Sequence, residues 1–177
     1  SPFTAVGLVL GVVSFFNILY GTLVGISKFE VKDIEFHHPN LPKAFDGYRI
    51  VQLSDIHIGS WIDNEKPINE LIVFTGDLVN QRSCELEGFQ DILAQLHAKD
   101  GVYSILGNHD YGSYYHWKNL KEQVNNIDNL IRMQKTMGWK LLNNEYDILH
   151  HEGDSIALIG VENDGEPPFS QFADLKK

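Results

Sequence analysis

Three side chains with different chemistries, Asn108, His109 and Asp110, directly follow Gly107 at the end of an apolar run. A chain leaving a strand needs only a turn residue such as Gly or Asn. The Asn108 amide oxygen can bind a hard cation, and the His109 imidazole can transfer a proton near neutral pH. The Asp110 carboxylate can hold that imidazole in one orientation. Taken alone, the stretch is equally compatible with a turn beside a solvated histidine.

Two earlier apolar runs also end in side chains that bind metals. Asp55 and His57 follow the run 49–53, and while the chain stays extended their side chains point to the same side. Asp77 follows the run 71–75 after a single glycine. Each pattern alone is common in ordinary turns. Because parallel strands end at one edge of a sheet, all three patterns would meet there, and together they predict a metal site.

The elements that would position these residues alternate between buried strands and amphipathic helices. This alternation predicts an α/β domain with parallel strands at its centre. The expected elements are a half-exposed strand over 27–38, buried strands over 49–55, 71–77 and 101–108, helices over 85–98 and 118–138, and a hairpin over 147–161 that turns at 152–154.

Composition describes an ordinary folded domain, with 43% hydrophobic and 21% charged residues. The formal net charge of −10 argues against a stable nucleic-acid partner, because the phosphate backbone is held mainly by Lys and Arg. Cys84 is the single cysteine, which excludes an intramolecular disulfide and a cysteine-based zinc cluster.

Residues 1–27 contain no charged side chain. A helix over Phe3–Ile26 would reach roughly 36 Å, enough to cross a hydrocarbon core of about 30 Å. The segment has neither a basic leading region nor an Ala-x-Ala-like cleavage site, which argues against a signal peptide. A buried core helix is the other alternative. We expect 1–27 to be a transmembrane anchor, in which Gly7/Gly11 and Gly21/Gly25 form Gly-x-x-x-Gly pairs that allow close helix–helix contact.

The order Asp-x-His, Gly-Asp and Gly-Asn-His-Asp resembles the calcineurin-like metallophosphoesterase superfamily. The stretches 41–60 and 71–80 further resemble its bacterial membrane-anchored branch, and the resemblance covers roughly residues 28–177. It implies a sandwich of central mixed β-sheets flanked by helices, preceded here by one transmembrane helix. It also implies hydrolysis of phosphate mono- or diesters by a hydroxide held between two divalent ions, either Mn, Fe, Zn or Mg.

The resemblance also assigns roles to the residues at the three strand ends. His109 would stabilise charge on the phosphate and protonate the leaving oxygen, with Asp110 as its partner. Four residues would bind metal: Asp55 and His57 the first ion, Asp77 both ions, and Asn108 the second.

Two departures from the family pattern lead us to expect an incomplete domain over 28–177. The family completes its site with a further lone histidine and a Gly-His-x-His motif, and neither occurs in these 177 residues. The crossover at 60–70 is short for a parallel connection and contains Pro67. We therefore expect residues to be missing both at 60–70 and after Lys177.

Other residues near the predicted site have weaker assignments. His116 is placed to touch a substrate, whereas the histidines outside 57, 109 and 116 are expected at the surface. Glu162 and Asn163 follow another apolar run, and we assign them no role. One group of aromatic residues either lines an apolar part of the cleft or packs under a loop: Trp61, Tyr111, Tyr114, Tyr115 and Trp117.

Three hypotheses follow. The first is a phosphoesterase anchored in the bacterial inner membrane, with a lipid-linked phosphate or pyrophosphate as substrate, because the linker from Ile26 to the first buried strand is short. The second is a non-catalytic membrane scaffold that retains the fold with an incomplete metal site. The third is a domain that binds a single metal ion. The metal content of the purified protein distinguishes them.

Overall fold

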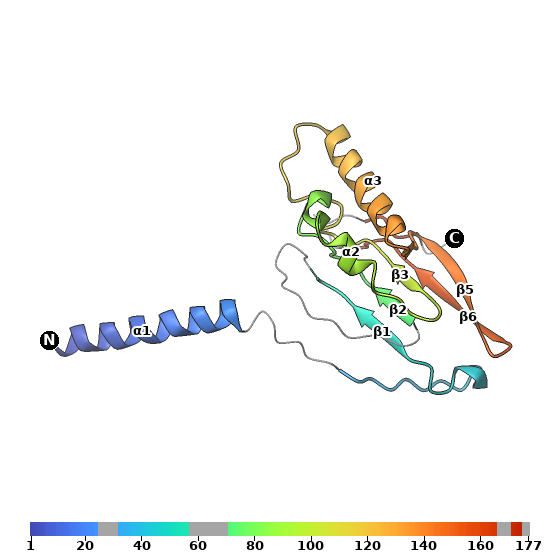
Figure 1. The fold of residues 1–177 in the computed structure, drawn as a ribbon, viewed down its shortest axis with the longest axis horizontal. Helices are drawn as coiled ribbons and strands as arrows, with labels where there is room; N and C mark the ends of the chain where they lie inside the picture. Colours follow the sequence, from blue (N-terminus) through green and yellow to red (C-terminus); the bar gives the residue numbers. More distant parts are fainter. Residues whose placement is uncertain (25–31, 57–70, 166–170, 175–177) are drawn as a thin grey trace. The chain divides into compact units, whose positions relative to one another are not determined.

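The computed structural model describes residues 1–24, 32–56, 71–165 and 171–174. The chain divides into two compact units, Ser1–His37 and His38–Lys177. The first unit contains α1 (Pro2–Leu23), which has Ser1 at its N-cap and no buried residue (Figure 1). By length and composition α1 is a candidate membrane span. The predicted apolar helix is therefore present, and residues 25–27 of the predicted segment lie outside the described residues.

The strand predicted over 27–38 is wrong for the residues that the structure describes. Residues 32–38 form no regular element, and residues 27–31 lie outside the described part. Ile34 is 87% exposed and Phe36 is 74% exposed. Alternation of apolar and charged residues produces a strand only where the apolar face has something to pack against, and these two side chains are not buried.

The second unit is built around a four-stranded parallel sheet in the order β1-β2-β3-β4 (Figure 1). The register pairs Ile50 with Leu71, Ile72 with Val102, and Tyr103 with Lys140. The predicted parallel centre of the domain is confirmed. Its strands are β1 (Ile50–Leu53), β2 (Leu71–Phe74), β3 (Val102–Ser104) and β4 (Lys140–Leu141).

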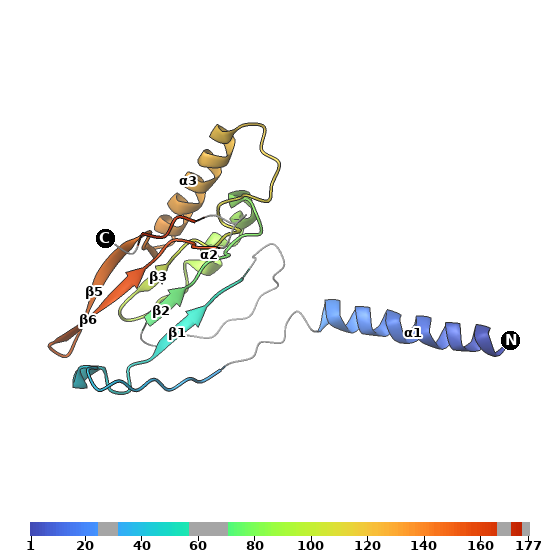
Figure 2. The same cartoon turned by 180° about the vertical axis from the view of Figure 1, so that it is seen from behind.

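Alternate residues of the parallel strands face opposite layers. Ile72 and Phe74 of β2 belong to a buried cluster that includes Leu130 of α3 (Leu120–Thr136). Leu71 belongs to a second cluster with Leu149 of β5 (Glu145–His151). The helices thus cover one face of the sheet and a hairpin covers the other, as two opposite views show (Figures 1 and 2). Coverage of both faces explains the continuous apolar runs of β2 and β3, which are buried. The prediction that the strand over 49–55 is buried is wrong, because β1 stands at the end of the strand order and Ile50 is 50% exposed.

The hairpin predicted over 147–161 and the helix predicted over 118–138 are both confirmed. β5 pairs antiparallel with β6 (Asp154–Gly160), and His151 pairs with Asp154. Glu152 and Gly153 both have positive φ, 48° and 94°. Two central residues with positive φ form the turn that matches the twist of a two-residue hairpin. Helix α3 starts at Asn119, whose side chain accepts a hydrogen bond of 3.0 Å from the Glu122 N–H.

The helix predicted over 85–98 is instead two short pieces. A 3₁₀ turn, η4 (Ser83–Leu86), is followed by α2 (Gln90–Leu93). Gly88 lies between them at φ 87°, a conformation that no residue of a right-handed helix adopts. The apolar spacing was nevertheless informative, because Leu86 and Leu93 are buried in the main core.

A polar triad connects the parallel sheet to the hairpin. The Lys140 ammonium lies 2.7 Å from the Asp147 carboxylate, and the Tyr103 hydroxyl donates a hydrogen bond of 2.8 Å to the same oxygen. The hydrogen bond from Lys140 is the main cause that lowers the pKa of Asp147 to about 2. The triad therefore favours the ionised carboxylate in the folded state.

We expect Lys140→Met to lower the free energy of unfolding by about 0.5 kcal/mol at pH 7, because the Lys140 side chain is 63% exposed and solvent screens the pair. A carboxyl whose pKa is depressed on folding contributes stability above its ordinary pKa, and this contribution is lost as the pH falls toward the folded value. The difference from the parent should thus shrink between about pH 4 and pH 2. Urea unfolding across this range measures it, with the exposed Lys99→Met as control. A difference independent of pH would contradict the role of the pair.

Candidate metal centre

The carboxyl ends of three parallel strands lie level with one another. Leu53 pairs with Phe74, and Phe74 pairs with Ser104. Backbone hydrogen bonds continue past these pairs, from the Thr75 N–H to the Leu53 carbonyl at 2.8 Å and from the Ile105 N–H to the Phe74 carbonyl at 3.0 Å. The loops that carry the predicted ligands therefore begin side by side at one edge of the sheet, as parallel topology requires.

Two aspartates in these loops share an uncommon backbone conformation. Asp55 has φ 55° and Asp77 has φ 57°. Non-glycine residues occupy this left-handed region rarely, although Asp tolerates it better than most. The Asp55 N–H also donates to the Gly76 carbonyl at 3.1 Å, which joins the first loop to the second. Strained residues of this kind concentrate at functional sites, where neighbouring contacts hold them in place.

The second and third loops approach each other at two glycines. A Cβ atom built on Gly107 would lie 2.2 Å from the Asp77 Oδ1 and 2.5 Å from the Asp77 backbone nitrogen. A Cβ atom on Gly76 would lie 2.5 Å from the Gly107 nitrogen. A side chain at position 107 would push the Asp77 carboxylate out of place, and one at position 76 would clash with the backbone of Gly107. The glycines before Asp77 and Asn108 are therefore needed for the close approach itself.

Asp110 is fully buried and holds this junction together. Its Oδ2 accepts hydrogen bonds from the N–H groups of Asp77 at 2.8 Å and Gly107 at 2.9 Å. Its Oδ1 accepts from the N–H groups of Leu78 at 2.9 Å and Val79 at 3.1 Å. Burial raises the pKa of Asp110 to about 7, while the backbone hydrogen bonds act in the opposite direction.

His109 is oriented by backbone groups of the second loop. Its Nδ1 lies 2.7 Å from the Asn80 carbonyl oxygen. Because a carbonyl only accepts, Nδ1 carries a proton, and Nε2 is the ring atom that can gain or lose one. The His109 backbone N–H donates to the Asp77 Oδ1 at 3.0 Å. We predicted Asp110 as the group that orients this imidazole, whereas the hydrogen bonds described for the Asp110 carboxylate all come from backbone amides.

Asn108 is held by Tyr114. The Asn108 Nδ2 donates a hydrogen bond of 2.8 Å to the Tyr114 hydroxyl, and the amide oxygen is the atom that could bind a cation. The Tyr114 ring also lies 4.8 Å, between centroids, from the His109 imidazole. One aromatic side chain thus contacts both a predicted ligand and the predicted proton donor.

The donors at this edge suit a hard divalent cation. The Asp55 and Asp77 carboxylates and the Asn108 amide oxygen are the donor types that Mg²⁺ and Mn²⁺ accept readily. Within the described ranges, no three His, Cys, Asp or Glu side chains lie close enough together to hold an ion. His57, the remaining predicted ligand, lies outside the described residues. By donor type, the residues present therefore fit a divalent cation and would supply part of its coordination shell.

The predicted aromatic residues have different environments. Tyr111 is buried, and its hydroxyl donates a 3.0 Å hydrogen bond to the Glu162 Oε1. Burial, followed by the hydrogen bond to Glu162, raises the pKa of Tyr111. Tyr114 and Tyr115 are exposed and Trp117 is half-buried, whereas Trp61 lies outside the described residues. His116, predicted to touch substrate, is exposed.

Nothing in the sequence indicated Asn80 at this edge, and Glu162 was expected there without an assigned role. Asn80 acts through its backbone carbonyl, which carries no signature in the side-chain sequence. Glu162 accepts from the Asn144 amide at 2.6 Å as well as from Tyr111, and it ties the ends of β4 and β6 to the loop after β3. Asn144 has φ 53°, like Asp55 and Asp77. The position of Asn144 shortly after an apolar strand was the sequence signal for this conformation.

Comparison with known proteins agrees with this geometry. The family model described as "Calcineurin-like phosphoesterase" matches residues 48–171. A "Transmembrane protein with metallophosphoesterase domain" from Danio rerio is 33% identical over 103 residues, covering 52% of this chain and 24% of that protein. The "UDP-2,3-diacylglucosamine pyrophosphatase LpxG" of Chlamydia trachomatis is 36% identical over 104 residues, covering 50% of this chain and 31% of that protein.

The solved structure of phosphopantetheinyl hydrolase (PptH) from Mycobacterium tuberculosis matches with a TM-score of 0.40 at 13% identity, over 63% of this chain and 41% of that one. The chain spans about a quarter to a third of the length of the curated relatives described above. Residues 48–171, the range that the family model matches, include all three strand ends with their predicted ligands. The chain therefore belongs to the calcineurin-like phosphoesterase family.

Proposed function

We propose that this chain is part of a membrane-anchored phosphoesterase that uses two divalent metal ions. The observation that carries the proposal is the placement of Asp55, Asp77, Asn108 and His109 in loops that leave neighbouring parallel strands at one edge of the sheet, with both aspartates in a left-handed conformation. Membership of the phosphoesterase family supports the reaction class. When bound, the two ions would polarise the phosphoryl oxygens and activate a water molecule as nucleophile.

Within this proposal the metal ligands keep the roles expected above. Asp55 and His57 would bind one ion, Asn108 would bind the other, and Asp77 would bind both. The metal is Mn, Fe, Zn or Mg, all of which accept carboxylate, amide and imidazole donors to some degree. Asp110 has a positioning role, because its carboxylate fixes the backbone on both sides of Asp77 and Asn108.

His109 acts on the leaving group. The Asn80 carbonyl accepts a hydrogen bond from the Nδ1–H of His109, so Nε2 carries the second proton of the cationic ring. Nε2 can then stabilise the charge that develops on the phosphoryl group and deliver its proton to the departing oxygen. The hydrogen bond from the His109 N–H to the Asp77 Oδ1 supports this role, because it keeps the proposed proton donor next to a proposed metal ligand.

The role of His109 predicts an effect that depends on the leaving group. We expect His109→Gln to lower kcat/KM by about 100-fold for an alkyl phosphodiester, whose leaving oxygen needs a proton. The loss should be less than about tenfold for a p-nitrophenyl ester, whose leaving group departs without one. Steady-state kinetics with both esters measure the difference, and the exposed His97→Gln is the control. Equal losses for the two esters would show that His109 is not the proton donor.

The membrane anchor is the second part of the proposal. We place it at residues 1–27, before a phosphoesterase domain that begins near residue 28. The apolar helix α1 and a transmembrane relative support it. The relative LpxG is a pyrophosphatase of UDP-2,3-diacylglucosamine, a nucleotide that carries an acylated sugar. A lipid-linked phosphate or pyrophosphate is therefore the substrate class that we propose, and the face of α1 with Gly7 and Gly11 is where we propose contact with another helix.

A further inference from the structure

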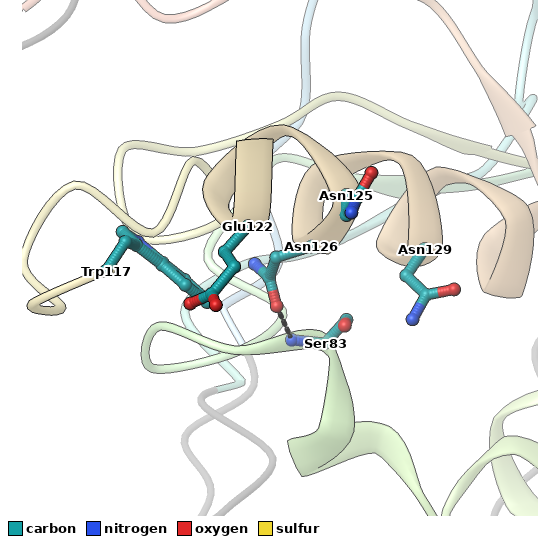
Figure 3. Close-up of a pocket in the computed structure, with 6 residues that line it drawn as sticks. All are labelled: Ser83, Trp117, Glu122, Asn125, Asn126 and Asn129. Carbon is teal, nitrogen blue, oxygen red and sulfur yellow. Dashed lines mark hydrogen bonds between the residues drawn. The ribbon is translucent and has the colours of Figure 1, made fainter. Parts of the chain in front are cut away.

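A cavity of about 290 Å³ opens between the first turns of α3 and the loop that leads into η4 (Figure 3). It contains none of the predicted metal ligands. Its floor is polar and ordered: Asn126 is 8% exposed, its Oδ1 accepts a 2.7 Å hydrogen bond from the Ser83 N–H, and its Nδ2 donates to the Gln81 carbonyl at 3.4 Å. The six lining residues are Ser83, Trp117, Glu122, Asn125, Asn126 and Asn129.

The walls present amides along one helix and an aromatic ring at one end. Glu122, Asn126 and Asn129 recur at helical spacing and so share one face of α3. Figure 3 shows Asn126 and Asn129 directed toward the Ser83 side, with Trp117 beside Glu122. The indole is held in place by its Nε1, which donates to the Gly112 carbonyl at 2.7 Å.

The indole is also packed from outside the cavity. The Tyr115 ring lies 4.7 Å, between centroids, from the Trp117 ring, and Arg82 lies 5.0 Å above the centroid of Tyr115. Because the Trp117 ring is already held in place, little conformational entropy is lost when a ligand packs against it.

The chemistry of the lining defines what it can bind. Among the six lining residues Glu122 is the charged one, and Arg132 beside them donates a hydrogen bond to the Asn129 Oδ1, so the opposite charges favour a neutral ligand. The Asn126 amide is engaged by Ser83 and Gln81, and the side-chain amides that face a ligand are the Asn125 amide and the Asn129 Nδ2. Here they are spread along a helix, where neighbours lie about 5–6 Å apart, and do not converge on one edge as recognition of a nucleobase would require. Amides at this spacing can bind hydroxyl groups at the edge of a ligand ring. The indole can pack against the C–H groups on the flat side of the same ring.

The cavity lies close to the candidate metal centre along the chain. Asn80, whose carbonyl orients His109, is three residues before Ser83 of the cavity. Three residues of extended chain span at most about 10 Å. This bounds the distance from Asn80 to the cavity residue Ser83, and the reach of one substrate from His109 to the cavity is part of what we propose below.

We propose that this cavity is a binding subsite for a neutral, polyhydroxylated ring such as a sugar, carried by the substrate next to its phosphate. The part that links the ring to the phosphate rests on the proposed function. Binding of the neutral sugar does not, because the cavity contains no metal ligand.

Binding of a sugar is tested without catalysis. Saturation-transfer NMR with methyl α-glucopyranoside on the full chain should show binding, and Asn129→Leu should weaken it about tenfold, as loss of a hydrogen-bonding group predicts. Asp128→Leu, on the same helix but off this face, is the matched control and should bind as the parent does. Because a change at Asn129 could disturb α3, Trp117→Leu provides a second test from outside the helix. Absence of binding, or equal binding by the parent and both cavity variants, would overturn the proposal.

Kinetics then separate this subsite from the proposed function. Two p-nitrophenyl phosphodiesters are compared, one carrying a methyl glucoside and the other an ethyl group. We expect Asn129→Leu to raise KM about tenfold for the sugar ester alone. Hydrolysis of both esters with unchanged KM values would overturn the subsite and leave the phosphoesterase intact. Sugar binding without hydrolysis of either ester would overturn the proposed function and leave the sugar site intact.

Discussion

Asp77→Asn is expected to lower phosphoesterase kcat/KM by more than about 100-fold, because loss of a residue that merely supports a metal ligand already costs about 10- to 100-fold. Asp77 is proposed to contact both ions, and an amide supplies one neutral oxygen in place of a charged pair. The same substitution should leave the fold almost unchanged. The Asp77 Oδ1 accepts the His109 N–H at 3.0 Å, and an asparagine oxygen can accept it equally well.

Two measurements on the purified full-length protein check this result. Elemental analysis should find two ions per chain in the parent and a reduced content in Asp77→Asn, while kinetics with a p-nitrophenyl phosphodiester give the loss of activity. Asp128→Asn, an exposed change on α3, is the control. Unchanged metal content and activity in Asp77→Asn would contradict the bridging role. A parent protein with no bound metal and no activity would favour the scaffold hypothesis.

Asp110→Ala should be the most destabilising of these substitutions. It removes the acceptor of four backbone N–H groups, those of Asp77, Leu78, Val79 and Gly107. A buried donor left without a partner costs about 1–3 kcal/mol. Since solvent can reach some of these amides after local rearrangement, we expect the free energy of unfolding to fall by about 3–5 kcal/mol.

Asp110→Asn distinguishes the effect of the carboxylate from the effect of filling the space at this position. An asparagine keeps one oxygen but turns an NH₂ group toward two of the four donors, so its loss of stability should be intermediate. Urea unfolding of metal-free protein measures all variants on one scale, and Asp91→Ala, exposed on α2, should change stability by less than about 0.5 kcal/mol. A change below about 1 kcal/mol for Asp110→Ala would contradict the positioning role.

The sequence predicted the parallel sheet, α3 and the hairpin because their signals are local. Apolar runs of strand length, helical spacing in 118–138 and the turn at Glu152 each lie within one element. The helix over 85–98 failed at Gly88, where backbone conformation overrides apolar spacing. The strand over 27–38 failed for residues 32–38, because alternation does not reveal whether a partner surface exists.

The candidate site was predictable in its residues but less so in its contacts. Strand ends of a parallel sheet meet by topology, so Asp55, Asp77 and Asn108 could be grouped without coordinates. The partners of Asp110 lie up to 33 positions away and are backbone amides, which have the same chemistry in every residue. The Asn80 carbonyl beside His109 is hidden for the same reason.

The left-handed aspartates also bear on how the chain would respond to selection. Glycine adopts φ near 55° without the steric cost that a Cβ atom brings, so Gly at positions 55 and 77 would relieve backbone strain. Selection for thermal stability alone would favour glycine at these two positions. Selection for turnover would keep aspartate and accept the weaker fold. The two loops are therefore places where the demands of folding and of chemistry oppose each other within a single residue.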